Sequence, residues 1–220
     1  MSSLDFLYKV KDDELEILAD ILREKGGITA SLPQRSNYLN KKEYTSAIIV
    51  ELLDYGSNTL WVREDYDTLV NDVCDKMDVD LSSDDSLYEK ENKLLGKVSS
   101  DLWDEMSEEG RKALLEAMNE QASIGVKGGA AMFAGIFRAG GFKSYQLSVI
   151  IANSMAKWAL GRGLSFGLNA TLTRVLSFLS GPLGVLMTVW TAIQIMGPAY
   201  RVTVPAVTYV ASLRRFSGGI

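Results

Sequence analysis

The sequence predicts an all-α protein built from two halves of opposite charge. Residues 1–120 hold all 28 acidic residues and 14 basic residues, a formal charge of −14, and their apolar side chains recur at helical spacing. Residues 121–220 hold nine basic residues and no acidic residue, a charge of +9, together with 14 of the 19 glycines. We therefore expect two domains: an acidic amphipathic helical half, 1–121, packed with a cationic, glycine-rich apolar helical half, 122–220.

Five amphipathic helices are expected in the acidic half. Each begins where carboxylates or a capping residue precede an apolar stripe of helical period. Asn40 with Glu43, and Ser86 with Glu89, have the spacing of a capping box. In chain order, the helices run from Asp12 to Gly26, from Asn40 to Gly56, from about Arg63 to Met77, from Ser86 to near Gly96, and from Ser107 to Met118.

Five further helices are expected in the cationic half, and glycine and proline separate them. They cover Gly125–Ala139, Tyr145–Leu160, Leu164–Ser180, Leu183–Met196, and a last helix from Thr203 to Arg215. The breaks are Gly140-Gly141, Gly161 with Gly163, Gly181-Pro182 and Gly197-Pro198. The run 202–210 contains Pro205, and it is the one place where a short strand would fit the pattern.

An uncharged run of 26 residues extends from Val175 to Tyr200 between Arg174 and Arg201. Gly181-Pro182 divides this run and leaves an uninterrupted helix of 14 residues, 183–196. At about 1.5 Å per residue that helix spans roughly 21 Å, less than a hydrocarbon core of about 30 Å. A constitutive transmembrane helix is therefore disfavoured.

We expect instead a buried helical hairpin, in which residues 164–180 and 183–196 are joined at Gly181 and Pro182. Exposure of so wide an apolar surface would promote aggregation. The side chains expected to be buried are those of Leu183, Val185, Leu186, Val189, Trp190 and Ile193. By analogy, pore-forming helical domains hide such a hairpin inside amphipathic helices, so a membrane-inserting effector stays an alternative.

Composition argues against an enzyme. Histidine is absent, which removes the commonest general base and zinc ligand, and no phosphate-binding loop occurs. The single cysteine, Cys74, lies between Asp72 and Asp75, whose carboxylates oppose thiolate formation, so we expect it to be buried and inert. We assign no catalytic residue, no cofactor and no metal ligand.

The segment Asp78–Glu89 partly matches a calcium-binding EF-hand loop. Oxygen-bearing side chains stand at positions 1, 3, 5, 9 and 12 of that pattern. Ser83 replaces the usual glycine, however, and Asp85 replaces an apolar residue. A solvated loop before a capped helix is favoured, and calcium binding remains the alternative.

The basic residues of the cationic half are the candidate contact residues. They can pair with the acidic half of the same chain, or each can gain about 1 kcal/mol beside an anionic membrane surface. A protein partner is a further alternative, while the net charge of −5 argues against nucleic acid. The candidates are Lys127, Arg138, Lys143, Lys157, Arg174, Arg201, Arg214 and Arg215.

The location expected from the sequence is the cytoplasm, and a peripheral position on the inner membrane is the alternative. No cationic n-region or apolar h-region follows Met1, so no signal peptide is expected. A lone cysteine fits a reducing compartment. The sequence does not predict an oligomeric state.

Several segments together resemble the bacterial YaaW family. The most specific is the run from Gly197 to Val207, continued by Ser212-Leu-Arg-Arg215. The resemblance covers nearly the whole chain and also includes Leu4–Leu7, Asp12–Leu22, Tyr55–Trp61, Asp72–Lys76 and Gly140–Gln146. The family is sometimes linked to ubiquinol–cytochrome c chaperones, which implies a soluble assembly factor, and it supplies no catalytic residues.

The function expected from these observations is non-enzymatic. Residues 122–215 associate reversibly with a membrane surface or a protein partner, and residues 1–121 serve as a helical adaptor. A chaperone-like assembly factor is the first alternative, and a pore-forming effector is the second.

Overall fold

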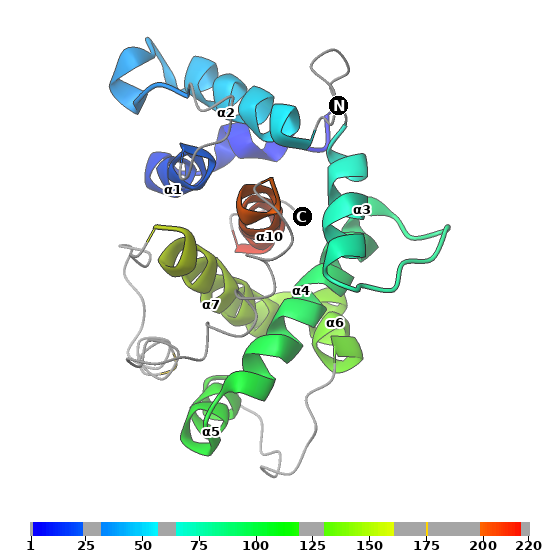
Figure 1. Cartoon of the computed structure of the whole chain (residues 1–220). Helices are drawn as coiled ribbons and strands as arrows, with labels where there is room; N and C mark the ends of the chain where they lie inside the picture. The colour runs from blue at the N-terminus through cyan, green and yellow to red at the C-terminus, as the bar shows by residue number, and fades with distance from the viewer. Residues whose placement is uncertain are drawn as a thin grey trace.

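The structure, a computed structural model, describes residues 2–23, 32–56, 65–118, 130–160, 175 and 199–216. Within these ranges the chain forms α-helices and two short 3-10 helices and contains no strand, so the all-α prediction is confirmed (Figure 1). The elements are η1 (Asp5–Lys9), α1 (Asp12–Arg23), η2 (Arg35–Asn37), α2 (Lys41–Gly56), α3 (Tyr66–Lys76), α4 (Leu87–Glu105), α5 (Glu108–Ala117), α6 (Ala130–Ala139), α7 (Gly141–Leu160) and α10 (Tyr200–Phe216).

Local capping explains where most helices of the acidic half begin. The side chain of Ser86 accepts a hydrogen bond from the amide of Glu89, and the Glu89 carboxylate accepts one from the amide of Ser86, which completes the predicted capping box of α4. Ser107 caps α5 by accepting from the amide of Gly110. For α3 the cap is Asp65, whose carboxylate accepts from the amide of Thr68, so this helix begins at Tyr66 rather than at about Arg63.

The helix that begins after Ser86 does not end near Gly96, as the sequence suggested, but continues to Glu105. Gly96 faces α6, where an added Cβ would lie only 2.7 Å from the carbonyl oxygen of Ala130 and 2.8 Å from Cβ of Ala134. The glycine therefore permits close approach of two helix backbones instead of terminating a helix. The same two helices also meet through Trp103 of α4 and Phe133 of α6, whose ring centroids lie 6.1 Å apart.

The break between α6 and α7 lies at the predicted glycine pair. Gly140 and Gly141 have φ angles of 68° and 74°, in the left-handed region that side-chain-bearing residues rarely adopt. The amide of Gly140 donates to the carbonyl of Ile136 at 3.1 Å, which closes α6. The next helix starts directly at Gly141, four residues earlier than the sequence indicated.

The C-terminal helix α10 runs through the middle of the molecule (Figure 1), where it packs against α1, α2, α3, α4 and α7. It begins at Tyr200 rather than at Thr203, and the run 202–210 is helical, so the strand considered there does not form. Pro205 lies inside this helix, where it removes one backbone hydrogen bond, the one that its missing N–H would donate to the carbonyl of Arg201. The apolar residues of this helix join the others in one continuous core.

Several predicted features lie outside the described residues. These are the boundary near residues 121–124, most of the helix 164–180, the helix 183–196 and the hairpin residues Gly181, Pro182, Val189 and Trp190. Val175, from the first of these helices, is described and is fully buried. Helices from both sides of the boundary contribute to the same core. Among the described helices, none has the length and apolarity that a bilayer crossing needs.

Candidate functional site

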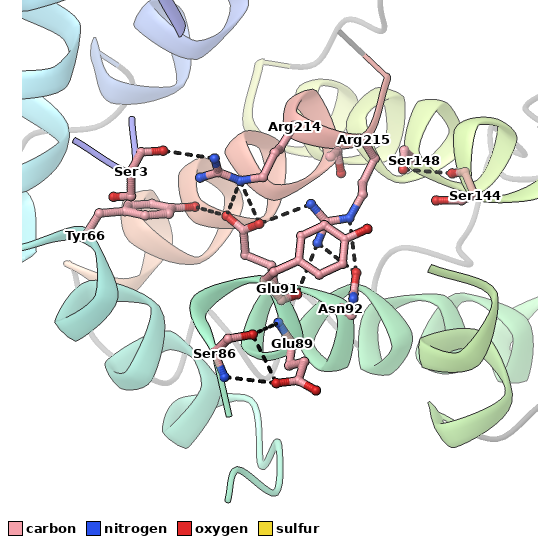
Figure 2. Close-up of polar contacts among 12 residues, drawn as sticks. Ser3, Tyr66, Ser86, Glu89, Glu91, Asn92, Ser144, Ser148, Arg214 and Arg215 are labelled. Atoms are coloured by element: carbon pink, nitrogen blue, oxygen red, sulfur yellow. Dashed lines mark hydrogen bonds and ion pairs between the residues drawn. The ribbon is translucent and has the colours of Figure 1, made fainter. Parts of the chain in front are cut away.

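A fully buried carboxylate joins the two halves of the chain. Glu91 of α4 has an exposed fraction of 0%. The Nε of Arg214 lies 2.9 Å from Oε2 of Glu91, and the Nη1 of Arg215 lies 3.2 Å from the same oxygen (Figure 2). The hydroxyl of Tyr66 donates to the other oxygen, Oε1, at 3.2 Å. Both carboxylate oxygens are thus satisfied, as burial of a charge requires.

Other donors of the two arginines bind nearby backbone and amide oxygens. The Nη1 of Arg214 donates to the carbonyl of Ser3 at 2.9 Å, and the Nη2 of Arg215 donates to Oδ1 of Asn92 at 2.7 Å (Figure 2). Each guanidinium also lies over an aromatic ring, Arg214 at 4.3 Å from Phe6 and Arg215 at 4.0 Å from Tyr88. We call the group Tyr66, Glu91, Asn92, Arg214 and Arg215 the buried ion cluster.

Electrostatics within the buried ion cluster keeps Tyr66 a hydrogen-bond donor. Its pKa is raised well above the usual value, first by burial and second by the charge of Glu91. The cluster contains two guanidinium groups and one carboxylate. In the part of the chain that the structure describes, Nη2 of Arg214 and Nδ2 of Asn92 have no hydrogen-bond partner. The cluster therefore fixes the position of α10, rather than adding much net stability over an apolar contact.

The predicted contact residues fall into three groups. Arg214 and Arg215 pair with the acidic half, which was one of the alternatives left open by the sequence. Arg138 and Arg201 are exposed, whereas Lys143 and Lys157 are half-buried. Arg201, Lys143 and Lys157 each take part in a further interaction within the chain. Lys127 and Arg174 lie outside the described residues.

Exposed apolar side chains gather where α6 meets α7. Phe142 is 64% exposed and Tyr145 is 42% exposed, and their rings lie 6.5 Å apart at an interplanar angle of 14°. Arg138, in the last turn of α6, is exposed as well. We call Arg138, Phe142 and Tyr145 the exposed corner.

Packing explains which side of α6 stays uncovered. Phe133 and Phe137 are fully buried, on the face of α6 that packs on α4. An added Cβ at Gly135 would meet no atom within 4 Å, so this helix has open space on its other side. Sequence reasoning missed Phe142 and Tyr145, although their spacing of three residues, directly after the glycine pair, places them on one side of a helix start.

The single cysteine has the surroundings of a core residue. Cys74 is buried, as predicted, and has no disulfide partner. Burial raises the pKa of its thiol to about 12. The thiolate form that a nucleophile requires is therefore disfavoured at neutral pH.

The carboxylates at the end of the calcium-like loop have roles within the chain. The Oδ2 of Asp85 accepts from the amide of Ser82 at 2.7 Å and pairs with Lys93. Glu89 completes the capping box described above. Across the residues that the structure describes, no group of three or more acidic or cysteine side chains is arranged to hold a metal ion.

Comparison with known proteins gives the family. A protein of Helicobacter pylori strain J99, named UPF0174 protein, is 37% identical over 227 residues, which cover 96% of this chain and 90% of that protein. The chain belongs to the UPF0174 family. Another UPF0174 protein from the same strain is 34% identical over 191 residues, covering 79% of this chain and 88% of the relative.

The chain is also related to YaaW, the protein that gives its name to the family in the sequence resemblance. UPF0174 protein YaaW of Escherichia coli K12 is 27% identical over 246 residues, covering 97% of this chain and 94% of that protein. The resemblance to the YaaW family is therefore confirmed. No family model matches the chain, and no solved structure matches it.

Proposed function

We propose that this UPF0174 protein is a non-enzymatic helical protein that associates reversibly with an anionic membrane surface through its cationic half. The observation that carries the proposal is the absence of any acidic residue from residues 121–220, which contain nine basic residues. Two of those, Arg138 and Arg201, are exposed in the structure. An anionic bilayer is the partner whose charge this half complements.

The strength expected of this contact is modest. Each basic side chain beside an anionic leaflet contributes about 1 kcal/mol, and that attraction falls off within about 10 Å at moderate salt. Arg214 and Arg215 are engaged by Glu91, so they contribute to the position of α10 rather than to the surface. A contact made by the remaining basic residues would be reversible and sensitive to salt.

The non-enzymatic part of the proposal rests on side-chain chemistry. The chain has no histidine, and its one cysteine has a pKa raised to about 12. Tyr66 and Tyr209, which are buried, have pKa values raised well above the usual range, mainly by burial. None of these groups is suited to proton transfer or nucleophilic attack near neutral pH.

Co-sedimentation with lipid vesicles tests the proposal. The full chain is mixed with vesicles of phosphatidylcholine alone or with added phosphatidylserine, at low and at high salt. We expect stronger binding to the phosphatidylserine vesicles than to phosphatidylcholine alone, and weaker binding at high salt than at low salt. Indifference to both vesicle types at low salt would contradict the proposal and favour an assembly factor that acts on a protein partner. Leakage of an entrapped dye from the vesicles would point to the pore-forming alternative.

A further inference from the structure

We infer that the bilayer contact is made at one defined place, the exposed corner, where Phe142 and Tyr145 enter the interfacial layer and Arg138 meets the headgroup phosphates. This inference rests on the proposed membrane association and specifies its site. It also adds an apolar component, which high salt does not screen, to an electrostatic contact.

Exposure of the two rings is the first argument. Phe142 and Tyr145 are the most exposed large apolar side chains of the cationic half among the described residues, while Ser144 and the residues 146–152 behind them are buried. The start of α7 therefore projects beyond the core, with its aromatic side chains outward. Their rings stack on each other at 6.5 Å, which presents one apolar surface instead of two separate ones.

Backbone geometry is the second argument. The left-handed φ angles of Gly140 and Gly141 set the direction in which α7 leaves α6. An added Cβ at either glycine would meet no atom within 4 Å, so crowding does not explain these glycines. Their backbone conformation requires them, and that conformation directs the aromatic pair outward.

Chemical character is the third argument. Tyr145 combines an apolar ring with a hydroxyl, the combination found at the level of lipid headgroups. Arg138 lies exposed at the end of α6, four residues before Phe142, and within electrostatic range of the carboxylate of Glu89 on α4, while residues 121–220 themselves contain no acidic residue. The corner thus pairs interfacial aromatic residues with positive charge, as membrane-surface elements do.

The size of the surface favours a bilayer over a protein. A stable protein interface buries about 1,200–2,000 Å² in total, which needs some 20 residues on each side. Among the described residues, the exposed corner consists of three side chains, Arg138, Phe142 and Tyr145. Interfacial binding to lipid, by contrast, works with a few inserted side chains and flanking cations.

The test uses the full chain with Phe142→Ala and Tyr145→Ala together, and phosphatidylserine-containing vesicles as the probe. The matched control is Leu39→Ala with Val50→Ala, which removes two exposed apolar side chains, 93% and 37% exposed, from the acidic half. We expect the corner variant to bind vesicles about tenfold more weakly than the parent, because it loses the burial of two aromatic rings. The control should bind as the parent does.

Two outcomes would contradict the inference. Equal vesicle binding by the corner variant and the parent would overturn the inference and leave the proposed function standing. A parent that ignores the vesicles would overturn both, and a protein partner would then be the better explanation. A further variant, Arg138→Gln, should weaken binding at low salt and leave the salt-resistant part unchanged. If the double variant loses helix content, Phe142→Ser alone makes the same distinction.

Discussion

Arg215 of α10 and Glu91 of α4 lie 124 residues apart in the chain, yet their side chains meet in the interior with Nη1 and Oε2 at 3.2 Å. Glu91 has an exposed fraction of 0%, and the side chain of Arg215 is also buried. This contact, with the parallel one from Arg214, attaches the last helix of the cationic half to the acidic half.

Loss of the Glu91 charge should therefore destabilise the whole fold. Glu91→Gln leaves two buried or partly buried guanidinium groups without their anion, and removal of one partner of a buried pair typically costs about 3–5 kcal/mol. Urea unfolding followed by circular dichroism measures this cost. The matched control is Asp67→Asn, which breaks the more exposed pair with Lys90 and should cost less than about 1 kcal/mol. Equal losses in the two variants would contradict the assigned role of Glu91.

Two helical glycines offer a paired test of helix packing. Gly96→Ala places a Cβ 2.7 Å from backbone atoms of α6, so we expect a loss of about 1–3 kcal/mol in unfolding free energy. Gly135→Ala, in α6 itself, meets nothing within 4 Å and should stabilise by about 0.5–1 kcal/mol. Thermal unfolding of the two variants beside the parent would show opposite shifts. Similar shifts would refute the close approach of α4 and α6.

The glycine pair between α6 and α7 gives a third prediction. Gly140→Ala forces a side-chain-bearing residue into a φ of 68°, which should cost about 1–2 kcal/mol. The same change at Gly135 is its control, because that helix position has no strained angle. Denaturant unfolding measures the difference. A neutral Gly140→Ala variant would contradict the left-handed conformation, and with it the direction assigned to the first turn of α7.

A buried carboxylate on α2 predicts how stability depends on pH. The pKa of Glu51 is raised from its usual 4.5, first by burial and second by the nearby charge of Asp54. The folded state then holds a proton that the unfolded state has already released, so this contribution to stability is present at low pH and is lost as pH rises through the raised pKa.

Glu51→Gln replaces the carboxyl group by an amide that does not ionise, and it keeps the length of the side chain. We expect the variant to gain stability relative to the parent as pH rises from about 4.5 to neutral, because the parent must ionise a buried group. Urea unfolding across this range measures the difference between the two. A difference that does not change with pH, or that changes in the opposite direction, would show that Glu51 is not desolvated.

Helix starts were predictable because caps are local. Asn40, Ser86 and Ser107 were identified from the sequence alone, the first two by capping-box spacing, and in the structure each accepts a hydrogen bond from the third residue after it. Helix continuation was harder to predict, since Gly96 looks like a helix end in the sequence and Pro205 looks like part of a helix start or a short strand. The contact of Gly96 with α6 and the place of Pro205 in the second turn are properties of the fold, so local pattern could not reveal them.

The candidate site was likewise predictable only in part. Charge asymmetry between the halves was visible in composition, and it singled out Arg138, Arg214 and Arg215. Composition could not tell that Arg215 is buried against Glu91 while Arg138 is exposed, because that depends on which helices meet. The exposure of Phe142 was hidden as well, since an aromatic residue at a helix start usually belongs to the core.

Salt-dependent binding to vesicles is the most direct measurement of the proposed function. The full chain is titrated with phosphatidylserine-containing vesicles at increasing salt, beside pure phosphatidylcholine vesicles and the Phe142→Ala, Tyr145→Ala variant. We predict binding to the anionic vesicles that weakens with salt toward a residual, ring-dependent level, and only weak, salt-insensitive binding to the neutral vesicles. Equal binding of the parent to both vesicle types, or to neither, would contradict recognition of an anionic membrane surface by this cationic half.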